Sequence, residues 1–127
     1  LVMAYENDYM MRTIKEMLRV IAKLLGKTTV TYELPAEEND TAEDALYRRL
    51  IGMADAGEIN EAENLLFEAL EENGEAAGGA ALAFYEYLND MDADFLDEHD
   101  YSREEVSLGI KNVAHVLGCE SVADALM

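Results

Sequence analysis

The chain has 127 residues, of which 50% are hydrophobic and 29% charged, as expected for one soluble globular domain spanning residues 1–127. Its net charge of −19 disfavours binding to nucleic-acid phosphates. The single cysteine, Cys119, excludes an intramolecular disulfide and favours a cytoplasmic location.

The charge is distributed unevenly along the chain. Residues 1–27 contain 5 basic and 3 acidic side chains, and residues 28–127 contain 4 basic and 25 acidic ones. The sequence therefore predicts three parts: a basic amphipathic helix at residues 8–26, a linker at residues 27–41 and an acidic helical body at residues 42–127.

The first helix is predicted to begin at Asp8 as its N-cap and to end at Gly26. Its apolar residues recur at spacings of four and three, at Met10, Ile14, Met17, Ile21 and Leu24. This apolar seam suits packing inside a helical bundle, and it also suits pairing with the same helix of a second copy in a homodimer.

The opposite face of this helix is basic, which raises the alternative of an adaptor docked on an anionic membrane surface. Five charges between Met10 and Leu25 prevent the helix from spanning a bilayer. The apolar side has no Trp or Phe, so it would be a weak anchor, and membrane contact is the less favoured interpretation.

Residues 27–34 are rich in β-branched side chains but have no second strand nearby, so we expect an extended connector. Thr41 and Asp44 have the spacing of a capping box, which predicts the start of the next helix. Ser102 and Glu105 repeat this pattern later in the chain.

The acidic body is predicted to contain helices at about residues 42–56, 60–73, 80–91 and 106–117, and a short last helix from Ser121 to Leu126. With the first helix, these segments predict an all-α bundle of five to six helices.

The second and third of these helices resemble a tetratricopeptide repeat, a helical hairpin of peptide-binding scaffolds. The likeness covers about residues 46–74 and rests on Gly57, Ile59, Ala62 and the pair Ala69-Leu70. It departs from the family pattern at Arg49-Leu50 and at Gly74, and no second copy is in register. The resemblance thus implies one repeat-like hairpin inside a closed domain. The whole chain also resembles small acidic helical proteins of unknown function from Firmicutes, which implies no activity.

Asp90, Asp92 and Asp94 match the first three ligand positions of an EF-hand calcium loop. Phe95 stands at the required glycine and Tyr101 at the bidentate glutamate, so these aspartates are weak metal candidates. His115 and Cys119 are four residues apart, but Gly118 lies between them and no second pair completes a metal site.

No motif indicates a catalytic residue or a cofactor, so the sequence favours a non-enzymatic interaction or assembly module that binds a protein partner or itself. Tyr47, Tyr85 and Tyr87 are candidates for lining a partner groove. The alternative from another class is a metal- or carboxylate-dependent enzyme that uses the acidic segment 90–100.

Overall fold

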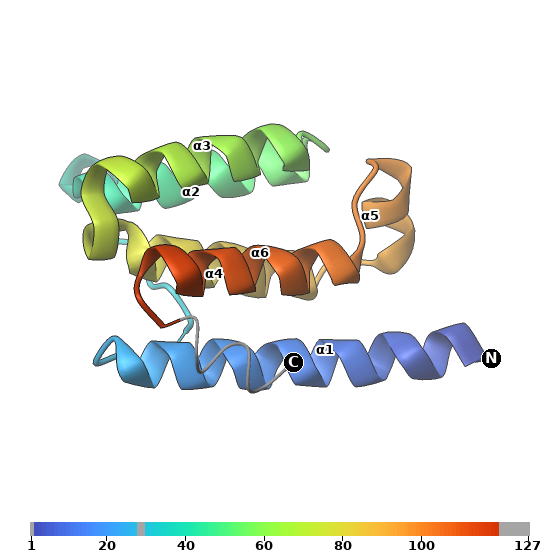
Figure 1. Ribbon diagram of the computed structural model, residues 1–127. Helices are drawn as coiled ribbons and strands as arrows, with labels where there is room; N and C mark the ends of the chain where they lie inside the picture. Colours follow the sequence, from blue (N-terminus) through green and yellow to red (C-terminus); the bar gives the residue numbers. More distant parts are fainter. Residues whose placement is uncertain (1, 28–29, 120–127) are drawn as a thin grey trace.

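A computed structural model of the chain describes residues 2–27 and 30–119 (Figure 1). Its helices are α1 (Val2–Leu24), α2 (Ala42–Asp55), α3 (Ile59–Asn73), α4 (Gly78–Asn89), α5 (Ala93–Glu98) and α6 (Arg103–Val116), with 3-10 turns at Glu37–Asn39 and Gly74–Ala77. No strand occurs within these described ranges, so the prediction of an all-α bundle is confirmed.

The helices form three layers (Figure 1). Helices α2 and α3 make one outer layer, α4 and α6 the middle layer and α1 the other outer layer, while α5 closes one end. Ten of the 12 residues of α4 are buried, because this helix is apolar nearly all round and packs against α1, α2 and α6.

The apolar seam of α1 packs inside the chain. Ile14, Met17 and Ile21 are at most 1% exposed and belong to the core that α1 forms with α4 and α6. Met10 is half-buried, and Leu24 is 53% exposed. The helix begins at Val2, so Asp8 lies within it and the predicted N-cap is wrong, because no glycine or proline interrupts residues 2–8.

The capping predictions hold at two other helices. Thr41 Oγ1 accepts the Asp44 N–H at 3.1 Å, and the Asp44 carboxylate accepts the Thr41 N–H at 2.9 Å. Ser102 likewise accepts the Glu105 N–H at the start of α6. The helix expected after Ser121 lies outside the described residues.

Helices α2 and α3 form the expected hairpin, and its turn contacts α5. Gly57 has a φ of +87°, and a Cβ there would lie 2.2 Å from the His99 ring. Glycine is therefore required both by the backbone and by the packing of α5, a helix that the sequence interpretation missed.

Candidate functional site

The three aspartates with EF-hand spacing are exposed and lie at helix ends. Asp92 is the N-cap of α5, where its carboxylate accepts the Asp94 N–H at 3.2 Å. Asp90 lies 4.0 Å from the Lys15 ammonium. Within residues 2–27 and 30–119, no group of three His, Cys, Asp or Glu side chains is arranged to hold a metal ion.

Two of the three tyrosines suggested for a partner groove are packing residues in this structure, and the third, Tyr87, is half-buried and donates a hydrogen bond to Asp55. Tyr47 is 8% exposed, and its ring stacks on Tyr32 with centroids 4.7 Å apart. Tyr85 is fully buried and packs edge-on against Phe84. Like Ile14, Met17 and Ile21 of α1, the side chains of Tyr47 and Tyr85 pack in the interior of the bundle.

The exposed side of α1 instead forms one wall of a groove of about 580 Å³. We call it the basic groove, and its lining residues are Lys15, Arg19, Ala22, Lys23, Lys27, Val30, Glu86 and Asp90. Helix α1 supplies three of its cations and the connector supplies Lys27. The two carboxylates come from Glu86 of α4 and from Asp90, the C-cap residue of that helix. Four of the nine cations of a chain with net charge −19 thus line one groove.

Glu86 is the least solvated acid of the basic groove. Burial, and then the repulsion of Asp90, raise its pKa above the ordinary value, while Lys15 and a hydrogen bond from Thr31 act in the opposite direction. The Lys15–Asp90 pair at the rim is exposed, so it contributes little to stability and leaves the Lys15 ammonium accessible.

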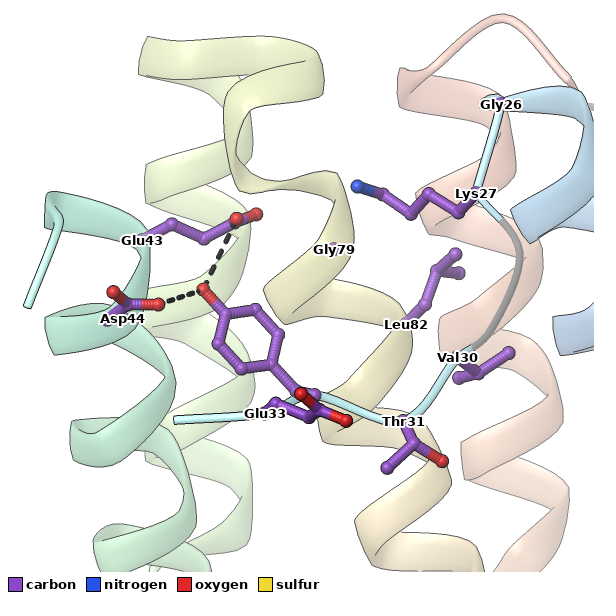
Figure 2. A pocket seen from close by; sticks show the side chains of 10 residues that line it. Gly26, Lys27, Val30, Thr31, Glu33, Glu43, Asp44, Gly79 and Leu82 are labelled. Carbon is purple, nitrogen blue, oxygen red and sulfur yellow. Dashed lines mark hydrogen bonds between the residues drawn. The ribbon is translucent and has the colours of Figure 1, made fainter. Parts of the chain in front are cut away.

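A smaller pocket of about 400 Å³ lies on the other side of the connector and shares Lys27 and Val30 with the basic groove (Figure 2). There the Tyr32 hydroxyl donates to Asp44 at 2.5 Å and is 3.3 Å from Glu43. Glu43 also accepts the Ala80 N–H at 3.2 Å. The bonds of Tyr32 attach the connector to α2, and the bond of Glu43 joins α2 to α4.

Gly79 leaves room for Lys27 in this pocket. A Cβ at position 79 would lie 3.2 Å from Lys27 Nζ and 3.1 Å from Glu43 Oε2. Figure 2 shows the Lys27 side chain extending across Gly79 toward Glu43. The Lys27 ammonium therefore lies against Gly79 in the smaller pocket, and Lys27 stands at the boundary between this pocket and the basic groove.

The chain matches the model of DUF6483, described as a family of unknown function, over residues 4–118. It belongs to this family. No curated protein and no solved structure matches the chain. The range matched by the DUF6483 model contains every residue that lines the basic groove, so the groove lies within the family's domain.

The sequence interpretation recorded the basic face of α1 but assigned the importance of this helix to its apolar seam. Lys15, Arg19 and Lys23 follow one another at a spacing of four residues, which places them on one face of a helix. The contributions of Lys27 and Glu86 come from other elements and have no signal in the local sequence.

Proposed function

We propose that the protein is a non-enzymatic interaction module that binds an acidic segment of a protein partner in the basic groove. The observation that carries this proposal is the gathering of three cations of α1 in one groove of a strongly acidic chain, with Lys27 at its boundary. The likeness of residues 46–74 to tetratricopeptide repeats agrees with a binding role, although the proposed groove lies on α1.

The spacing of the cations suits an extended peptide. Lys15, Arg19 and Lys23 are separated by four residues each, and an α-helix rises about 6 Å over that interval. Alternate side chains of an extended strand lie on one face and are about 6.6 Å apart. A peptide with acidic residues at alternate positions therefore brings one carboxylate to each cation.

The remaining lining favours a peptide over a nucleic acid. Glu86 and Asp90 lie inside the groove and would repel a continuous row of phosphates. A peptide can place uncharged residues, or its backbone N–H groups, opposite these two carboxylates. The small apolar residues Ala22 and Val30 leave room for such uncharged side chains.

The layered fold separates the basic groove from most of the acidic surface. Helix α1 lies in the layer opposite α2 and α3, with α4 and α6 between them (Figure 1). Each helix layer adds about 8–10 Å, whereas the screening length at physiological salt is about 8 Å. The acids of α3 thus have little influence on an anionic ligand bound at α1.

The membrane alternative has weaker support. Tyr9 and Leu24 are the large hydrophobic side chains exposed on α1 in its described part, and they lie toward opposite ends of the helix. They do not make a continuous apolar stripe that could enter a lipid surface. No helix within the described ranges is long and apolar enough to cross a bilayer.

The proposal is tested with a short labelled peptide in which glutamate alternates with threonine, titrated by fluorescence anisotropy. We expect the double substitution Arg19→Glu and Lys23→Glu to weaken binding at least about tenfold, because two attractive contacts become repulsive. The matched control is Arg49→Glu, an exposed arginine on α2 outside the groove, which should leave the affinity nearly unchanged.

Equal weakening by the groove and control variants would show that only the overall charge matters and would reject the proposal. So would failure of the unmodified protein to bind the peptide at low salt. Stronger binding of a single-stranded oligonucleotide or of anionic lipid vesicles, lost in the groove variant, would assign the groove to that ligand instead.

A further inference from the structure

A second groove, of about 440 Å³, lies between α3 and α6, and we call it the α3–α6 groove. These two helices lie in front of α2 and α4 in Figure 1. Leu108 and Val116, both on α6, are 54% and 42% exposed and line this groove, and Phe67 of α3 lines it as well. Two of the four large hydrophobic side chains exposed within the described ranges are therefore gathered here.

One end of the groove holds a carboxylate that is fixed in place. Glu63 Oε2 accepts hydrogen bonds from the Tyr85 hydroxyl at 2.6 Å and the Tyr101 hydroxyl at 2.9 Å. Burial and the charge of Glu63 raise the pKa of both tyrosines, so both phenols remain protonated donors. The carboxylate therefore has a defined position and orientation before any ligand binds.

No cation of the described residues pairs with Glu63. Among residues 2–27 and 30–119, no Lys, Arg or His lies within ion-pair distance of it, and its second oxygen, Oε1, has no hydrogen-bond partner. Glu105 lines the same end of the groove and adds to the negative potential. A half-buried carboxylate with an unused oxygen is a ready acceptor for an ammonium or guanidinium group.

Gly109 makes this arrangement possible. A Cβ at position 109 would lie 2.4 Å from the Tyr85 hydroxyl oxygen, so only glycine lets that hydroxyl pass beneath α6 to reach Glu63.

We propose that the α3–α6 groove binds an amphipathic helix of a partner protein, whose apolar stripe covers Leu108 and Val116 and whose Lys or Arg pairs with Glu63. The groove wall from Glu105 to Val116 is about 17 Å long, which corresponds to three helical turns. A bound helix would cover both exposed apolar side chains and bring a cation to the uncompensated carboxylate. This inference is independent of the acidic partner proposed for the basic groove.

The test uses a synthetic helical peptide with leucines along one face and arginine at both ends, titrated against the whole chain. A second peptide replaces the arginines with glutamine, and a third has the first peptide's composition in scrambled order. We expect the arginine peptide to bind at least about tenfold more tightly than the other two. Leu108→Asn should weaken its binding about tenfold without unfolding the protein, because Leu108 is exposed.

Glu63→Gln tests the cation contact, since glutamine still accepts the two phenolic hydrogen bonds but carries no charge. It should reduce the preference for the arginine peptide over the glutamine peptide by about tenfold, whereas Glu68→Gln, on the exposed surface of α3 outside the groove, should not.

Three outcomes would overturn the inference. The first is no binding of the arginine peptide at millimolar concentration, and the second is equal binding of the scrambled peptide. The third is self-association of the free protein that Leu108→Asn abolishes, detected by light scattering, because it would assign the groove to a second copy.

Discussion

The basic groove and the α3–α6 groove are both built on α4, but by different physical means. Two consecutive residues of that helix point in different directions: the Tyr85 hydroxyl reaches Glu63 beside α6, while Glu86 lines the basic groove next to α1. The basic groove gathers several long cationic side chains, whereas the α3–α6 groove positions one carboxylate with buried tyrosines.

This difference determines how each groove responds to substitution. Exposed lysines and arginines lose side-chain entropy when they pair, so each alone contributes little to the affinity for an anionic ligand. The electrostatic potential of the basic groove therefore depends on how many cations line it. The orientation of Glu63 depends on the packing of three elements around it, so a small steric change there should alter both the fold and the binding site.

The largest expected change in stability distinguishes the apolar face of α1 from its basic face. Met17 is fully buried, and Met17→Ala should lower the free energy of unfolding by about 2–5 kcal/mol through lost burial and the cavity left behind. Arg19→Ala, on the basic face, should change it by no more than about 0.5 kcal/mol. Urea denaturation measures both, and similar losses would contradict the assignment of one face to the core and the other to a ligand.

The second prediction concerns the α3–α6 groove. Gly109→Ala places a methyl group against the buried Tyr85 hydroxyl, and such overpacking should cost about 1–3 kcal/mol, more than alanine gains by helix propensity. Gly52→Ala in α2 is the matched control, because apart from its chain neighbours and the helix's own backbone no atom lies within 4 Å of the added Cβ. It should raise stability by about 0.5–1 kcal/mol. Thermal unfolding should show shifts of opposite sign.

The features that could be predicted from the sequence are those that depend on residues close together in the chain. The all-α class and the capping residues Thr41 and Ser102 followed from side-chain spacing and hydrogen-bonding ability. The row of cations on α1 was visible for the same reason, because residues four apart share a helix face.

Features that depend on tertiary packing could not be predicted. An apolar seam with 4-3 spacing looks the same whether it packs against its own chain or a second copy, and the burial of Met17 assigns it to the core of the chain. The cluster of Glu63, Tyr85 and Tyr101 draws on α3, α4 and the segment before α6, which are far apart in the sequence. Helix α5 was missed because it is short and its aspartates suggested a loop.

A smaller effect is expected at the connector, which Tyr32 attaches to α2. Tyr32→Phe removes the hydrogen bond to Asp44 and should cost about 1 kcal/mol near neutral pH. That hydrogen bond is the main cause that lowers the pKa of Asp44, so its stabilisation is present above the ordinary aspartate pKa of about 4 and is lost as the pH falls through the lowered value.

The stabilities of the two proteins should therefore converge in acid, as measured by urea denaturation at a series of pH values. Tyr9→Phe is the control, because Tyr9 is 61% exposed, and it should match the unmodified protein at every pH. A constant difference between Tyr32→Phe and the unmodified protein down to the most acidic pH would show that the hydroxyl does not act through Asp44.

The smallest predicted effect tests whether Glu86 limits the affinity of the basic groove for the glutamate–threonine peptide. Burial raises the pKa of Glu86, so it takes up a proton at a higher pH than the peptide's solvated glutamates do. Lowering the pH from neutrality should therefore strengthen binding as Glu86 takes up its proton, because one repulsive charge in the groove is neutralised before the peptide loses its own charges. Glu86→Gln should bind more tightly at pH 7 and vary less with pH. If Glu86→Gln shows the same pH dependence of binding as the unmodified protein, another group causes that dependence. Glu86 then does not limit the affinity of the basic groove for the peptide.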